Sequence, residues 1–124
     1  GAANRRCYRA QCFATSRALA AALDVPPERT TTAFQSRMAG SRWIGPHTDR
    51  ILEDLHARGV RRLAVLTPSF VADCLETLEE IGIRLRDQWV DLGGDDLLVV
   101  PCLNAAPRWV DVVAELVVPE PRLR

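Results

Sequence analysis

The chain has 124 residues, of which 48% are hydrophobic and 26% charged, a composition typical of one globular domain with a core of its own. Its 16 basic residues balance its 16 acidic residues, so no general basic field attracts nucleic acid. We therefore expect no nucleic-acid partner, and the composition excludes a largely disordered chain.

No apolar run approaches the roughly 20 residues that a membrane-spanning helix needs. Residues 1–9 contain three arginines but no apolar stretch, so they do not resemble a secretory signal. The four cysteines form no Cys-x-x-Cys pair and match no common zinc or iron–sulfur ligand spacing. We expect reduced thiols in the cytoplasm and no iron–sulfur cluster.

Helical and strand-like patterns alternate along the chain. They predict a helix over residues 8–23, a strand over 30–34, a helix over 48–58, a strand over 63–66, a helix from 73 to about 86, a strand over 97–100 and a helix over 105–118. The apolar side of the last helix is formed by Trp109, Val113, Leu116 and Val117. Such alternation predicts an α/β fold with a small parallel sheet flanked by helices. We expect the domain to span residues 8–118, after a disordered or non-native lead over 1–7 and before a frayed tail over 119–124.

Three carboxylates follow the strand predicted over residues 63–66. Asp73, Glu76 and Glu80 stand three and four residues apart, which places them on one face of the predicted helix. In open α/β sheets ligands bind outside the carboxyl ends of strands, so we expect a site here first. Clustered carboxylates suit proton transfer or a hard divalent metal. Asp73 and Glu76 also have the spacing of a capping box, which leaves a purely structural interpretation open.

A second candidate is the loop over residues 35–46. Its arginines can bind carboxylates or phosphates, and its apolar residues can form one wall of a pocket. The candidate residues are Gln35, Ser36, Arg37, Met38, Arg42, Trp43 and Ile44. The alternative is a solvated loop with one anchored tryptophan. Together, the loop and the acidic helix suggest a flat, hydrophobic, acidic ligand that meets a metal or a proton acceptor.

Both segments belong to a wider set of motifs, at residues 8–12 (YRAQC), 34–37 (FQSR), 43–49 (WIGPHTD), 71–80 (VADCLETLEE) and 101–104 (PCLN). This set resembles the C-terminal half of bacterial-type ferrochelatases, over about residues 8–118. The resemblance implies a Rossmann-like (chelatase-like) domain of three layers. It also implies insertion of ferrous iron into a porphyrin to make heme, with loss of two pyrrole protons. Iron is then a substrate, and no organic cofactor is expected.

The same resemblance implies roles for individual residues. Glu76 faces the metal-exchange side of the macrocycle and contacts the metal, while Asp73 and Glu80 carry protons or metal along the helix. An apolar slot that bends the macrocycle exposes its nitrogen lone pairs, and the carboxylates collect the protons. By the resemblance, Trp43 lines the porphyrin pocket and Met38 lies in the same lip. We expect all seven loop residues named above to bind the porphyrin, and we infer from their charge, not from the resemblance, that Arg37 or Arg42 meets a propionate.

The chain departs from the family pattern at several positions. Ala39 and Ser69 stand where glycine is usual, His47 where tyrosine is frequent, and Arg84 where some members have a further acid. The family's His-Gly-Leu-Pro motif, which lies in the N-terminal half, is not found in this sequence. We therefore expect a partner, either the N-terminal half of a ferrochelatase or a second copy of the chain. Alone, the chain should insert iron poorly.

Two other interpretations stay open. The chain could be a short metal chelatase of tetrapyrrole synthesis that pairs with itself. It could also be a non-catalytic module that binds porphyrin or metal. Peripheral membrane contact is a further partner that the sequence leaves open.

Overall fold

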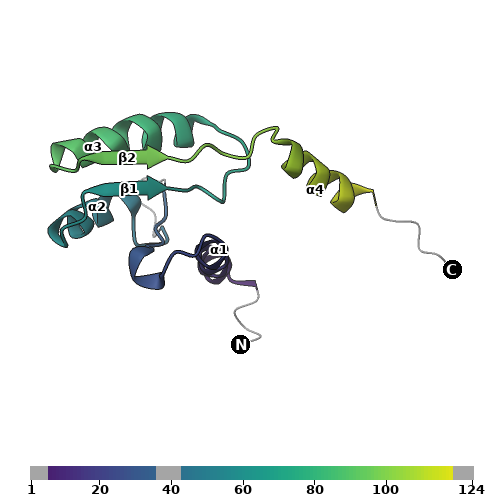
Figure 1. Cartoon of the computed structure of the whole chain (residues 1–124), viewed down its shortest axis with the longest axis horizontal. Helices are drawn as coiled ribbons and strands as arrows, with labels where there is room; N and C mark the ends of the chain where they lie inside the picture. Colours follow the sequence, from purple (N-terminus) through teal and green to yellow (C-terminus); the bar gives the residue numbers. More distant parts are fainter. Residues whose placement is uncertain (1–5, 36–42, 119–124) are drawn as a thin grey trace.

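The computed structural model describes residues 6–35 and 43–118, in which helices alternate with two strands (Figure 1). The elements in chain order are α1 (Tyr8–Ala22), the 3₁₀ turn η2 (Pro27–Arg29), α2 (Thr48–Ala57), β1 (Arg62–Val65), the π-helix η3 (Glu76–Leu85), α3 (Arg86–Asp91), β2 (Asp96–Val99) and α4 (Pro107–Val117). The parallel pairing of β1 with β2 and the flanking helices confirm the predicted α/β class. None of the helices in these ranges combines the length and the apolar character that a bilayer span requires.

The core lies under one face of the sheet. β1 and β2 pair in parallel, starting with Arg62 opposite Asp96. The buried apolar side chains of the core are Leu52 and Leu55 of α2, Ile81 and Leu85 of η3, Trp89 of α3 and Leu97 of β2. Because side chains alternate along a strand, Leu97 points into this core while Leu98 lies on the opposite face, 58% exposed.

Trp89 is the largest fully buried side chain of this core. Its indole nitrogen lies 3.2 Å from the carbonyl oxygen of Arg61 and 3.1 Å from that of Asp96, so the N–H donates to the backbone where both strands begin. The ring of His56 packs edge-on against it, with 5.9 Å between ring centroids. Trp89 therefore ties α2 and α3 to the amino ends of the sheet.

The strand predicted over residues 30–34 is wrong. Only Phe34 pairs, through a single parallel bridge with His47. The threonines of this segment have β-branched side chains but little apolar surface to bury, whereas Phe34 is buried and packs edge-on against Phe13 of α1. In the described ranges the sheet thus has two strands where we predicted three.

The helix after β1 differs from its predicted limits and in its type. We predicted a helix from residue 73 to about 86, but η3 begins at Glu76 and continues as α3 to Asp91. The hydrogen bonds of a π-helix join residues five apart, so its turn is wider than that of an α-helix. Arg84 accordingly contacts Glu79, five residues before it. Asp73 lies in the loop before the helix.

α4 stands apart from the other elements. Figure 1 shows it projecting beyond the carboxyl ends of the two strands, away from the sheet and its helices. We predicted an apolar side on this helix, and the structure leaves that side uncovered, because none of the residues of α4 is buried. The helix is therefore amphipathic as predicted but lacks a surface to pack on in the described part of the chain.

Gly94→Ala should lower the free energy of unfolding by about 2–3 kcal/mol, because the added methyl would overlap the indole of Trp89. Gly59→Ala is the matched control, since its methyl would meet no atom within 4 Å and only its φ of +85° is unfavourable. That strain should cost about 1 kcal/mol. Urea denaturation of both variants measures the difference, and an equal loss at the two sites would contradict the packing described around Trp89.

Candidate functional site

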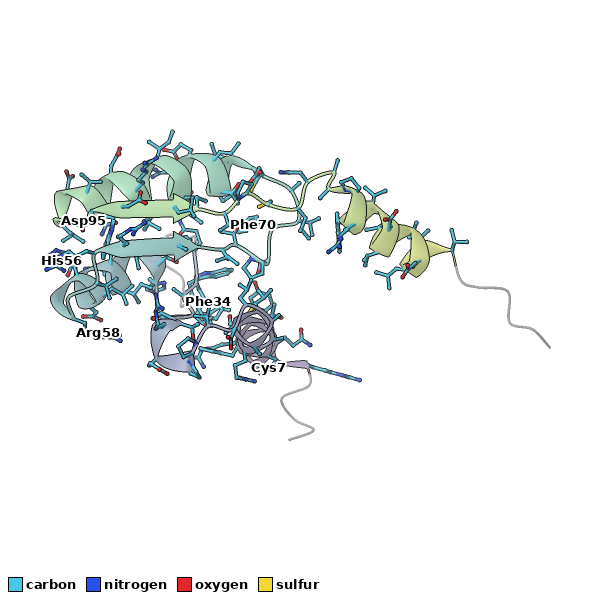
Figure 2. All side chains as sticks on the ribbon, in the orientation of Figure 1. Cys7, Phe34, His56, Arg58, Phe70 and Asp95 are labelled. Atoms are coloured by element: carbon cyan, nitrogen blue, oxygen red, sulfur yellow. The ribbon has the colours of Figure 1, made fainter. Side chains whose placement is uncertain are left out.

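The candidate site lies at the carboxyl ends of β1 and β2. Figure 2 shows Phe70 at this end of the sheet and His56, Arg58 and Asp95 at the opposite end. Two loops leave the strands here, over residues 66–75 and 100–106. Strand ends of this kind are where open α/β sheets bind their ligands.

Asp73 joins the two loops through a reciprocal pair of hydrogen bonds with Asn104. The side-chain amide of Asn104 donates to Oδ2 of Asp73 at 2.7 Å, and the backbone N–H of Asp73 donates to Oδ1 of Asn104 at 2.9 Å. The other carboxylate oxygen accepts from the backbone N–H of Cys102 at 3.3 Å. The bond from Asn104, followed by the contacts with Cys102, holds the pKa of Asp73 below its ordinary value of 3.8. Asp73 is thus an ionised cross-link between the loops.

The side chain of Thr77, not a capping box of Asp73 and Glu76, forms the hydrogen bonds near the start of η3. Its hydroxyl accepts from the backbone N–H of Cys74 at 3.0 Å and lies 3.1 Å from Oδ1 of Asp73, to which it donates. The side chain of Thr77 is almost completely buried. The carboxylate of Asp73 therefore faces the second loop and Thr77, and η3 begins without a side-chain cap. The capping-box interpretation of Asp73 and Glu76 is not what the structure forms.

Glu76 begins η3 as a half-buried carboxylate. The thiol of Cys74, followed by the backbone N–H of Glu76 itself, holds the pKa of Glu76 below its ordinary value of 4.5. Two apolar side chains beside it in the sequence remain exposed, Leu75 by 68% and Leu78 by 60%. The start of η3 therefore carries an ionised carboxylate, and the two exposed leucines add apolar surface to other sides of the same turn.

Glu80 contacts a different part of the molecule. The side-chain amide of Gln35 donates to Oε2 of Glu80 at 2.8 Å, and Nη2 of Arg84 lies 3.7 Å from its Oε1. The backbone carbonyl oxygen of Gln35 accepts a hydrogen bond from the indole N–H of Trp43 at 3.0 Å. Arg84 forms its shorter ion pair with Glu79, at 2.6 Å. The structure thus brings together Glu80, Gln35 and Trp43, which come from the two segments that the sequence singled out.

A cavity of about 390 Å³ lies beside Glu80. Its lining residues are Phe34, Gln35, His47, Thr48, Asp49, Glu80, Arg84, Leu85 and Gln88. Nδ1 of His47 is buried and has no hydrogen-bond partner in the described residues. Asp73 and Glu76 do not line this cavity. The three carboxylates that we expected on one helix face therefore lie in three places: Asp73 between the two loops, Glu76 at the start of η3 and Glu80 in the cavity wall.

Four of the expected porphyrin-binding residues, Ser36, Arg37, Met38 and Arg42, lie outside the described residues. Trp43 is 39% exposed and Ile44 is half-buried, so both remain accessible beside the acidic segment. Within residues 6–35 and 43–118, no three His, Cys, Asp or Glu side chains come close enough to hold a metal ion.

Sequence reasoning missed the residues that hold the carboxylates in place. Asn104 was noted only as part of a motif, and its φ of +49° marks it as the kind of residue that tolerates a left-handed turn. Thr77 was not singled out, because one threonine within a helical pattern carries no signal of its own. Cys74 stands two residues before Glu76, but neither spacing nor composition showed that its thiol would reach the carboxylate.

Comparisons with known proteins agree with the resemblance inferred from the motifs. The family model described as Ferrochelatase matches residues 2–120. A protein of Coxiella burnetii (strain Dugway 5J108-111) named Ferrochelatase is 50% identical over 113 residues, which cover 91% of this chain and 32% of that protein. One of Legionella pneumophila (strain Lens) with the same name is 49% identical over 114 residues, which cover 92% of this chain and 34% of that protein. The chain spans about a third of the length of the curated relatives it matches.

The pKa values of Asp73 and Glu76 should each rise when the side chain that hydrogen-bonds to that carboxylate is removed. Asn104→Gly, which keeps the left-handed turn, should raise the pKa of Asp73, and Cys74→Ala should raise the pKa of Glu76. Because the pKa of Asp73 is lowered in the folded state, its contribution to stability is present above pH 3.8 and is lost as the pH falls through the folded value. In Asn104→Gly the contribution should therefore be smaller, and its loss should be complete at a higher pH.

Carboxyl carbon shifts followed by NMR during an acid titration report both groups at once. Each variant is the control for the other, since Asn104→Gly should shift the pKa of Asp73 more than that of Glu76, and Cys74→Ala should leave the pKa of Asp73 unchanged. Equal shifts of both carboxylates in either variant would contradict the separate partners described above.

Proposed function

Because the chain belongs to the ferrochelatase family, we propose that it forms one wall of a porphyrin site at which ferrous iron is inserted to make heme. The observation that carries the proposal is Glu76, an ionised, half-buried carboxylate at the carboxyl end of a parallel sheet. The exposed Trp43 supplies apolar surface that suits the flat face of a macrocycle.

Glu76 is assigned the metal-side and proton-accepting role. Its negative charge attracts Fe²⁺, a cation for which carboxylate oxygen is an acceptable ligand. A macrocycle lying over Glu76 would remove water from it, and desolvation raises the pKa of a carboxylate. The group would then accept a pyrrole proton more readily with the substrate in place than without it. Insertion exchanges two pyrrole protons for one Fe²⁺, so no electron transfer and no organic cofactor is required.

The other two carboxylates are assigned different tasks. Glu80 lines the cavity and is oriented by Gln35, so it is placed to pass protons away from the site. Asp73 is held by Asn104 and Cys102, and its first task is to fix the loop from which Glu76 begins. Trp43 and Ile44 are assigned to the porphyrin wall, together with the loop residues 36–42 that carry the two arginines.

A second wall has to come from elsewhere. The chain matches only 32–34% of the length of its relatives, and its described residues provide no set of three metal ligands. We assign the second wall to the rest of a longer polypeptide of the family, with a second copy of the chain as the alternative. The four free cysteines support a reducing, cytoplasmic setting for such an enzyme.

One observation favours a second candidate function. Because Asp73 is fully engaged in joining two loops, the chain could be a binding module in which the acidic motif is structural. The two functions differ in what they require of Glu76, since a binding module has no proton or metal to transfer there.

Glu76→Gln should separate the two functions. The assay uses a chimera in which this chain replaces the matching third of the Coxiella burnetii relative, with the chain alone as a baseline that should insert iron poorly. The substitution keeps the shape of the side chain but removes its charge, so iron insertion should fall roughly 10²- to 10⁴-fold. The Kd for porphyrin, measured by fluorescence quenching, should change less than about threefold because the apolar side chains assigned to the porphyrin wall remain.

Glu79→Gln is the matched control, because Glu79 is an acidic residue of the same helix that pairs with the exposed Arg84. It should leave the rate of insertion nearly unchanged. An unchanged rate in Glu76→Gln would favour the binding module, and iron insertion by the chain alone at the rate of the full-length relative would refute the need for a second wall.

A further inference from the structure

Two adjacent acidic residues of η3, Glu79 and Glu80, follow Glu76 by three and four positions. Carboxylates that stand this close together suit a divalent cation, because their oxygens can share it. Fe²⁺ is a substrate in the proposed function, so an ion held at Glu79 and Glu80 would be iron kept away from Glu76. The contacts of Arg84 indicate how the chain avoids this.

Arg84 places its guanidinium against both carboxylates. Nη2 of Arg84 lies 2.6 Å from Oε2 of Glu79 and 3.7 Å from Oε1 of Glu80. Nε of Arg84 also donates to Oε2 of Glu79, at 3.0 Å. In an α-helix a side chain meets the residues three and four positions before it, but the wider turn of the π-helix brings the fifth within reach as well. One guanidinium therefore serves two neighbouring carboxylates.

The second oxygen of Glu80 is engaged as well. The side-chain amide of Gln35 donates to Oε2 of Glu80 at 2.8 Å, while Oε1 faces Arg84. A metal ion that binds Glu80 through both oxygens would have to displace an amide N–H and a guanidinium. A proton needs one lone pair, and each carboxylate oxygen has two, so it can bind with both donors in place.

The charge of Arg84 acts in the same direction. A guanidinium stays protonated in proteins, and the bond with Glu79 holds the pKa of Arg84 above its ordinary value. Because Coulomb energy scales with charge, Arg84 repels a divalent cation roughly twice as strongly as a proton at the same distance. The side chain of Arg84 is 65% exposed, so this repulsion should weaken as salt is added.

We propose that Arg84 is a selectivity residue, which occupies the place of a cation on η3 and keeps Fe²⁺ from binding at Glu79 and Glu80. Iron is then left to Glu76, and Glu80 stays open to the protons that insertion releases. This inference deepens the proposed function and rests on it for the roles of Glu76 and Glu80. The exclusion of metal from Glu79 and Glu80 does not depend on catalysis, so it can be measured separately.

The test titrates the chain with Mn²⁺ at low salt and follows the carboxyl carbon signals by NMR. Mn²⁺ prefers oxygen ligands, and its unpaired electrons broaden most the signals of the carboxylates that hold it. Arg84→Glu replaces the guanidinium by a third carboxylate on the same side of η3. In this variant the signals of Glu79 and Glu80 should broaden at a Mn²⁺ concentration at least about tenfold lower than in the unmodified chain.

Arg84→Lys and Arg86→Glu are the matched controls. Arg84→Lys keeps the positive charge, so the midpoints of Glu79 and Glu80 should stay within about threefold of those of the unmodified chain. Arg86 is exposed on the next turn, and Arg86→Glu makes the same change in net charge as Arg84→Glu. It should also move these midpoints by less than about threefold. Arg84→Gln removes the charge without adding an acid, and its midpoints should fall between those of the unmodified chain and Arg84→Glu.

Three results would overturn the selectivity residue. The first is equal broadening of Glu79 and Glu80 in the unmodified chain, Arg84→Gln and Arg84→Glu. The second is capture of Mn²⁺ by Arg84→Lys at the concentration that suffices for Arg84→Glu, because charge would then not be the cause. The third is an equal effect of Arg86→Glu, because the net charge of the chain would then explain the binding without any contact of Arg84.

These results are distinguishable from those that test the proposed function. Tighter Mn²⁺ binding in Arg84→Glu, together with an unchanged rate of iron insertion in Glu76→Gln, would remove the function and leave the exclusion of metal by Arg84 standing. Iron insertion that depends on Glu76, together with Mn²⁺ binding that ignores Arg84, would do the reverse.

Discussion

The pairing of Asp73 with Asn104 joins the loops that follow the two strands, and the rest of the strand-end region depends on it. The carboxylate of Asp73 accepts from the side chain of Asn104 and from the backbone of Cys102, while its own N–H donates back to Asn104. One loop leads into η3 and Glu76, and the other leads into α4. A single ionised side chain thereby joins the loop that leads to the proposed catalytic carboxylate to the loop that leads to α4.

Three carboxylates that look equivalent in the sequence have three different environments. Asp73 is surrounded by hydrogen-bond donors, and this keeps it ionised and structural. Glu76 is held by a thiol and its own backbone at the start of η3, where we propose that a bound macrocycle changes its solvation. Glu80 is shared between Gln35 and Arg84 at the cavity. The division of labour follows from these contacts, because the chemistry of the three groups in water is nearly the same.

The sequence allowed the α/β class, the family and the strand-end location to be predicted, because apolar periodicity and contiguous motifs are local signals. The sequence did not allow the structural role of Asp73 and its bond with Asn104 to be predicted, because the two residues are 31 apart in the chain. The π-helix was missed for a related reason, as its apolar spacing resembles that of an α-helix over ten residues. The apolar side of α4 was predicted, but its lack of cover in the described residues was not, because amphipathic spacing indicates an apolar face without indicating what buries it.

Amide hydrogen exchange at the two loops tests the central account most directly. The backbone N–H groups of Asp73, Cys102 and Asn104 donate respectively to Asn104, to Asp73 and to the carbonyl oxygen of Val71. If the Asp73–Asn104 pair joins the loops, these three amides should exchange slowly and at similar rates, and Asn104→Gly should accelerate all of them together. Exchange at the rate of an unfolded chain in the unmodified protein, or acceleration of only one amide in the variant, would contradict it.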